Sequence, residues 1–187
     1  LLSLVLVGAA VIRERERGTI EHLLVMPVNA FEIMMAKVLA NGVVILAASQ
    51  LSMWFMVHKI IGVPINGSLA MYAFGVGVYL FSIAALGIML ATIAPTMPQF
   101  GLLMLPVFMV LLLSSGSAAP RSNMPGAAQG ISEYWPTTQF AAFAQNVIYR
   151  GAGLEIVWPE LLVMAITGAV FLLFALFRFR KMLEQQG

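Results

Sequence analysis

The chain has 187 residues, of which 61% are hydrophobic and only 10% are charged, and its formal net charge is +2. Ordinary soluble domains carry about a quarter charged residues, so this composition excludes that class. Long apolar runs predict an all-α, polytopic transmembrane helix bundle instead. A β-barrel is disfavoured because the apolar runs are continuous rather than alternating.

Two further exclusions follow from the residue counts. The sequence has no cysteine, which excludes disulfides and thiolate metal sites. The pI of about 9.2 could indicate a nucleic-acid partner. Because basic residues mark the cytoplasmic loops of membrane proteins, we interpret the pI in that way and expect no nucleic-acid partner.

The first predicted element is the apolar segment 1–12. As a helix it would be about 18 Å long, whereas the hydrocarbon core of a bilayer is about 30 Å thick. We therefore expect the second half of a membrane helix that begins before residue 1. On this interpretation the chain is the C-terminal part of a longer protein and forms one transmembrane domain over residues 1–187.

The segment 13–36 is the most highly charged part of the chain and is predicted to be a cytoplasmic loop. It opens with RERER, in which Arg13 and Glu16, and likewise Glu14 and Arg17, are three residues apart. On a helix such pairs are neighbours. We therefore expect the membrane helix to continue for a turn into the cytosol.

Helix-capping and helix-breaking residues in the rest of this loop predict a short helix. Gly18 breaks the charged turn, Thr19 is a suitable N-cap, and Pro27 stops the amphipathic stretch IEHLLVM. The residues 29–32, NAFE, resemble a capping box that opens the next helix. The short helix could lie on the lipid surface, or it could dock onto a cytosolic motor subunit as a coupling helix.

Three membrane helices are predicted within 37–113, at about 38–57, 69–93 and 100–113, and Pro106 is expected to kink the third. The segment 114–157 is rich in glycine and proline. It is predicted to form short external helices, including an amphipathic one at about 138–149. A last membrane helix is predicted within 158–178, from about Pro159 to Phe177, followed by a cytoplasmic tail, 179–187.

The orientation follows from the basic residues, which are enriched on the cytoplasmic side. With the 13–36 loop inside, the cytoplasmic side has seven Lys and Arg residues: Arg13, Arg15, Arg17, Lys37, Arg178, Arg180 and Lys181. The outer side has three: Lys59, Arg121 and Arg150. Aromatic residues that favour the headgroup level fall at the predicted outer ends: Trp54, Tyr72, Tyr134, Trp135, Tyr149 and Trp158.

The predicted helices carry no charged residue near their middles, which argues against an ion-coupled carrier. Glu160 is expected at the outer interface. Neutral polar residues occur on the helix at 38–57, and we expect Asn41, Ser49 and Ser52, 8 and 11 residues apart, on one helical face with Gln50 to its side. They could line a substrate path. Alternatively, they could form hydrogen bonds between helices.

No enzyme site is predicted. The sequence lacks the G-x-x-x-x-G-K-[ST] phosphate loop. His22 and His58 are predicted on opposite sides of the membrane and cannot form a metal pair. The chain is therefore expected to be no enzyme and to take its energy from another polypeptide.

The stretch RERERGTIEHLLVMPVNAFEIMMAKV, residues 13–38, resembles the first cytoplasmic loop of type-2 ATP-binding-cassette (ABC) exporter permeases of the bacterial, drug-export-like kind. The segments SSGSAAPRSNMP, YWPTTQF and QNVIYRGAG resemble the external region before that family's last helix. The resemblance covers essentially the whole chain. It implies six membrane helices, of which this chain supplies the end of the second and all of the third to sixth.

The resemblance also implies partners and roles. The chain would be a multi-pass protein of the bacterial inner membrane with a cytoplasmic C-terminus. It would export a hydrophobic or amphipathic compound together with a second permease copy or paralogue and a cytosolic ABC ATPase. Membrane lipids and a periplasmic adaptor would be further partners. ATP and magnesium would be bound by the ATPase, with no cofactor on this chain. The ATPase would contact Arg17, Gly18, Thr19, Ile20, Glu21, His22, Leu23 and Leu24.

The main alternative function is a non-transporting membrane scaffold or assembly protein whose short helix docks some other cytosolic partner. A neighbouring gene that encodes a Walker motif would favour the exporter.

Overall fold

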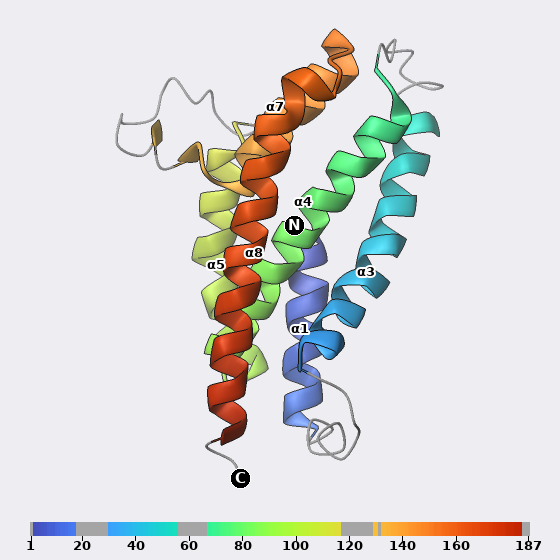
Figure 1. The fold of residues 1–187 in the computed structure, drawn as a ribbon. Helices are drawn as coiled ribbons and strands as arrows, with labels where there is room; N and C mark the ends of the chain where they lie inside the picture. Colours follow the sequence, from blue (N-terminus) through green and yellow to red (C-terminus); the bar gives the residue numbers. More distant parts are fainter. Residues whose placement is uncertain (1, 18–29, 56–66, 117–128, 131, 185–187) are drawn as a thin grey trace.

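The computed structural model describes residues 2–17, 30–55, 67–116, 129–130 and 132–184. Within these residues the chain forms a bundle of helices (Figure 1): α1 (Leu2–Glu16), α3 (Ala30–Ser52), α4 (Leu69–Ile93), α5 (Met97–Ser114), α7 (Pro136–Arg150) and α8 (Leu154–Glu184). Four segments are long and apolar enough to cross a membrane: Phe31–Phe55, Leu69–Ile93, Met97–Ser114 and Leu154–Phe179. The predicted all-α bundle is thereby confirmed.

The bundle has two distinct ends (Figure 1). At one end α1 finishes, α3 begins, α4 turns into α5, and α8 finishes. We call this the charged end, because the end of α1 contains Arg13, Arg15 and Arg17, the first turns of α3 contain Lys37, and the last turns of α8 contain Arg178. At the other end α3 finishes, α4 begins, and α7 is followed by α8. We call this the aromatic end, because the exposed rings of Trp54, Tyr149 and Trp158 belong to the end of α3, the end of α7 and the start of α8.

Helix α4 is the centre of the bundle. It packs against α1, α3, α7 and α8, and most of its apolar residues are buried, whereas most of those in α3 are exposed. Its bounds agree with the prediction because the sequence marks both ends: the Ser68 side chain accepts a hydrogen bond from Met71 N at 3.5 Å, and Pro95 follows the C-cap Ala94.

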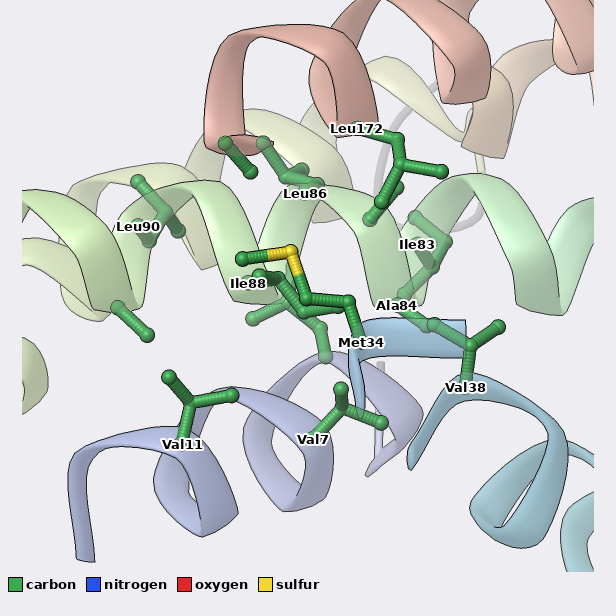
Figure 2. Packing of buried hydrophobic residues seen from close by; sticks show 14 of the residues in the cluster. Val7, Val11, Met34, Val38, Ile83, Ala84, Leu86, Ile88, Leu90 and Leu172 are labelled. Atoms are coloured by element: carbon green, nitrogen blue, oxygen red, sulfur yellow. The ribbon is translucent and has the colours of Figure 1, made fainter. Parts of the chain in front are cut away.

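The main core lies between α4 and its neighbours at the charged end (Figure 2). Val7 and Val11 of α1 face α4, and Met34 of α3 lies between them and Ile88. Leu172 of α8 packs on the opposite side of α4. Lipid tails are as apolar as this interior, so burying the side chains between helices gains little hydrophobic free energy. Close packing therefore holds the helices together.

Glycines allow two close helix crossings. A Cβ at Gly8 of α1 would lie 2.4 Å from the ring of Phe100 and 2.9 Å from the carbonyl oxygen of Gly87. Where α8 meets α4, a Cβ at Gly168 would lie 2.8 Å from the Ser82 hydroxyl oxygen. Ser82 donates a hydrogen bond to the carbonyl oxygen of Met164 at the same crossing. These small residues let the helix backbones approach one another.

Helix α3 begins at Ala30, within the predicted capping box at 29–32, so the last residues of the predicted 13–36 loop already belong to this helix. Two other helix starts differ from the predictions. Helix α5 begins at Met97, because Thr96 takes an extended backbone and Pro98 suits the first turn. Helix α8 begins at Leu154 and runs to Glu184, with Pro159 inside it. Because Pro159 has no N–H, the helix loses the bond that this position would make to the carbonyl oxygen of Glu155 in the first turn.

The amphipathic helix predicted at about 138–149 is confirmed as α7. Pro136 occupies its first turn, and Gly151 ends it in the left-handed region with φ of 63°. The N–H of Ala152 then donates to the carbonyl oxygen of Asn146 at 3.0 Å, which completes a Schellman-type end.

Candidate functional site

The charged end joins four helices through one short stretch of α1. Glu14 forms an ion pair with Lys37, which lies two turns into α3. This bond ties the last turn of α1 to α3, on either side of the intervening segment 18–29. Because the pair is only partly buried, we expect it to contribute positional order more than stability.

The next two residues of α1 bind the turn between α4 and α5. The Arg15 guanidinium donates to the carbonyl oxygen of Ala94, the C-cap of α4. The Glu16 carboxylate accepts a hydrogen bond of 2.8 Å from the backbone N–H of Met97, the first residue of α5. Burial lowers the pKa of Arg15, and the nearby Glu16 carboxylate raises it. The guanidinium nevertheless stays charged at neutral pH.

These bonds replace the pairs expected within RERER. The sequence predicts Arg13 with Glu16 and Glu14 with Arg17, but the carboxylates of Glu14 and Glu16 reach α3 and α5 instead. The helix itself does continue past the apolar part as predicted, and Arg17 N donates to the carbonyl oxygen of Arg13 at 3.1 Å. The side chains turn to other helices because the α4–α5 turn lies beside the last turn of α1.

Of the predicted ATPase-contacting residues, the structure describes Arg17, which is exposed at the end of α1. The others, residues 18–24, lie outside the described residues. Their role as a coupling helix stays a prediction. What the structure adds is the position of the two described residues on either side: Arg17 follows the end of α1, and Ala30 begins α3.

The predicted substrate-path residues lie on α3. At 3.6 residues per turn, Asn41 and Ser52 are about 20° apart, whereas Ser49 is about 80° from Asn41. Asn41 Nδ2 donates to the carbonyl oxygen of Lys37 at 3.0 Å, and Ser49 donates to that of Leu46 at 2.8 Å. Both bonds stay within α3. The side-chain nitrogen of Gln50 is buried with no hydrogen-bond partner among the described residues. A substrate path through these residues stays a prediction.

An apolar groove runs along α4 between α3 and α8. Its larger part has a volume of about 520 Å³ and is lined by Leu46, Ala73, Phe74, Gly77, Val78, Phe81 and Ala165. A smaller part of about 170 Å³ continues toward the charged end and shares Leu46, Gly77 and Phe81. A Cβ at Gly42 or Gly77 would meet no atom within 4 Å, so these glycines leave the groove open. Such a surface can accept hydrocarbon but offers no charge to a polar ligand.

At the aromatic end, aromatic side chains of α7 pack against α4. Phe140 stacks on Tyr79 with ring centroids 4.3 Å apart, and the ring of Phe143 fills the space left by Gly75. Thr138 donates a hydrogen bond of 2.8 Å to the carbonyl oxygen of Ser114, the last residue of α5. Helix α7 therefore fixes the end of α5 as well as the start of α4.

Glu160 lies near the start of α8 at this same end, where the sequence predicts an interfacial position. It is partly buried, and its Oε1 accepts a hydrogen bond of 3.1 Å from Asn146 of α7. Across the described part of the chain, no group of three or more His, Asp or Glu side chains is close enough to hold a metal ion. Among the described residues, the Glu, Lys and Arg side chains thus lie toward the two ends of the bundle.

Comparison with known proteins agrees with this arrangement of apolar helices and charged ends. Residues 1–177 match the family described as ABC-2 family transporter protein. The chain belongs to the ABC-2 transporter family. The resemblance seen in the charged stretch and the external segments is thereby confirmed.

Several relatives in the ABC-2 family are similar over most of this chain. It is 50% identical over 181 residues to the inner membrane transport permease YhhJ of Escherichia coli K12, covering 97% of this chain and 48% of the relative. It is 29% identical over 187 residues to the probable multidrug ABC transporter permease YbhR of the same organism, covering 96% and 49%. The chain thus spans about half the length of these relatives. No solved structure matches it.

Some residues of this ABC-2 chain were not found by sequence reasoning. The bonds of Arg15 and Glu16 to Ala94 and Met97 join parts of the chain about 80 residues apart. One available signal was the tight break APTMPQ, whose prolines mark a helix end and a helix start. The opposite charges of Arg15 and Glu16 match the partial charges at this turn, which are negative at the end of α4 and positive at the start of α5.

Proposed function

We propose that this chain is the membrane-spanning permease part of an ATP-driven ABC exporter in the bacterial inner membrane. It would move a hydrophobic or amphipathic compound outward, with ATP and magnesium bound by a separate cytosolic ATPase. A second permease chain would complete the pathway. The names of the relatives YhhJ and YbhR support the permease role and the inner-membrane location.

The observation that carries the proposal is the separation of charge and aromatic rings between the two ends. The basic residues Arg13, Arg15, Arg17, Lys37 and Arg178 lie at the charged end, and Arg180 and Lys181 follow in the last turns of α8, whereas Arg150 is the basic residue described at the aromatic end. Basic residues favour the cytoplasmic side, and Trp and Tyr favour the interfaces. The charged end would therefore face the cytosol, together with the segment 18–29 and the C-terminus.

The apolar groove supports the substrate class. A neutral, membrane-facing surface that runs along α4 suits a compound that partitions into the bilayer, and no described charge lines it. Neutral helices also fit a transporter whose energy comes from a partner rather than from ions moving through the bundle.

The test is association with the ATPase and transport in vesicles. Leu23→Glu in the full-length transporter should release the ATPase and abolish ATP-dependent export of apolar dyes, because a charge would disrupt an apolar docking face. Leu154→Glu is the matched control: it places the same substitution at an exposed leucine of the opposite end. Intact ATPase binding and transport in Leu23→Glu would contradict the coupling role proposed for residues 17–24. A wild-type protein that binds a cytosolic partner but moves no compound would favour the scaffold alternative.

A further inference from the structure

Arg15 and Glu16 sit opposite two helix ends whose dipoles have opposite signs. The carbonyl groups at the end of α4 carry partial negative charge, and the N–H groups at the start of α5 carry partial positive charge. Arg15 meets the first through the Ala94 carbonyl, and Glu16 meets the second through Met97 N–H. Adjacent residues of α1 thus match the two ends of one turn in sign and in hydrogen-bonding group.

Helix α5 depends on this contact for its first turn. Its N-cap residue, Thr96, makes no side-chain hydrogen bond to the helix. Pro98 has no N–H, and Phe100 N donates to the carbonyl oxygen of Thr96 at 3.0 Å. The N–H of Met97 is satisfied by Glu16 from α1, so the cap of α5 is supplied by another helix.

The rest of α5 packs against few neighbouring residues. Six of its large apolar residues are exposed, Leu102, Leu105, Phe108, Met109, Val110 and Leu113, and its buried residues are Phe100, Met104, Leu111 and Ser114. Phe100 packs on Gly8 of α1, close to the charged end. At the other end, the carbonyl oxygen of Ser114 accepts the hydrogen bond from Thr138. We therefore expect a displacement of the first turn of α5 to move the whole helix.

We propose that Arg15 and Glu16 are positioning residues that make the end of α1 and the α4–α5 turn move as one unit, so that force applied to the segment 18–29 reaches α5. The Glu14–Lys37 pair adds the start of α3 to this unit. The inference rests on the proposed function, because the ATPase would supply the force. It adds to that function by naming the residues that pass the force on and the helix that receives it.

The first test separates coupling from assembly. The double variant Arg15→Glu/Glu16→Arg keeps the net charge and composition but reverses both signs opposite the helix ends. In the full-length transporter we expect the ATPase to remain bound and active while transport per ATP hydrolysed falls several-fold, because the start of α5 is no longer held to α1. Glu16→Gln retains an acceptor oxygen and should be less affected than Glu16→Ala. Arg13→Gln is the control, since Arg13 is exposed in the same stretch.

The second test keeps the cluster intact and so holds even if the swapped variant does not fold. This chain has no cysteine, so spin labels can be placed at Arg13→Cys, Gln99→Cys and Tyr149→Cys. On addition of ATP to the transporter, the distance between the spin labels at positions 13 and 99 should stay constant. The distance between the labels at positions 99 and 149 should change.

The outcomes of the two tests are distinct. An unchanged ratio of transport to hydrolysis in Glu16→Ala and the double variant, or a 13–99 distance that changes with ATP, would overturn the inference. Absence of ATPase binding and ATP-dependent transport in the wild type would instead overturn the proposed function.

Discussion

Gly87 of α4 lies so close to Leu4 of α1 that a Cβ built on Gly87 would be 2.4 Å from the Leu4 carbonyl oxygen. The neighbouring atom belongs to backbone, so no side-chain rotation can relieve the contact. The two helices are therefore in direct backbone contact at this crossing, and any residue larger than glycine must push them apart.

Gly87→Ala should accordingly destabilise the bundle by about 1–3 kcal/mol, the usual cost of overpacking. The measurement is the thermal unfolding midpoint of the detergent-solubilised transporter. Gly101→Ala is the matched control, because a Cβ there meets no atom within 4 Å. Alanine favours the helix by up to about 1 kcal/mol relative to glycine, so the control should unfold at the same or a higher temperature. Equal midpoints for Gly87→Ala and wild type would contradict the crossing.

Gly75 and Phe143 should show energetic coupling. A Cβ at Gly75 would lie 2.0 Å from the Phe143 ring, which is fully buried. Gly75→Ala and Phe143→Leu should each lower the unfolding midpoint, the first by overpacking and the second by leaving a cavity. The double variant should be less destabilised than the sum, with a coupling free energy of roughly 1 kcal/mol. Simple additivity would mean that α7 is not seated on α4 in this way.

Gly151 should not tolerate a side chain, for a reason other than space. Its φ of 63° lies in the left-handed region, which costs a non-glycine residue about 1–2 kcal/mol. Gly151→Ala is expected to lower the unfolding midpoint, whereas Gly153→Ala, two residues away and in open space, should have little effect. Similar effects of the two changes would argue against the left-handed helix end.

Asn41 and Ser49 allow a clean test of the predicted substrate path. Their hydrogen bonds go to the backbone of α3 itself, so Asn41→Leu and Ser49→Ala should fold with unfolding midpoints close to wild type. If these side chains contact substrate, export should fall several-fold while ATPase binding is retained. Ala40→Leu is the control, because it places leucine at an exposed neighbour. Unchanged export in both variants would remove these residues from the path.

The sequence predicted the helices well where it marks their ends chemically. Helix α4 agrees at both boundaries because Ser68 caps it and Pro95 follows it. The sequence predicts that α8 starts at Pro159, whereas the chain already turns at Gly151 and enters the helix at Leu154. A proline in the first turns of a helix is compatible with either interpretation.

The candidate site was predicted less completely than the helices. The charged stretch was recognised from its composition, and its helical continuation past the apolar part was correct. Its binding partners could not be read locally, because Ala94 and Met97 come beside Glu16 only through the crossing of α1 and α4. Backbone groups such as the Ala94 carbonyl also have no residue-type signature in a sequence.

The contact between Gly8 and Gly87 has a mechanical consequence. Because the backbones of α1 and α4 touch there and the Arg15–Ala94 bond joins their ends, a tilt of α1 is expected to carry α4 with it. Glu16 lies eight residues beyond Gly8, an arm of about 12 Å. A tilt of a few degrees would then shift the Glu16 carboxylate, and with it the first residue of α5, by a fraction of an ångström to about one ångström.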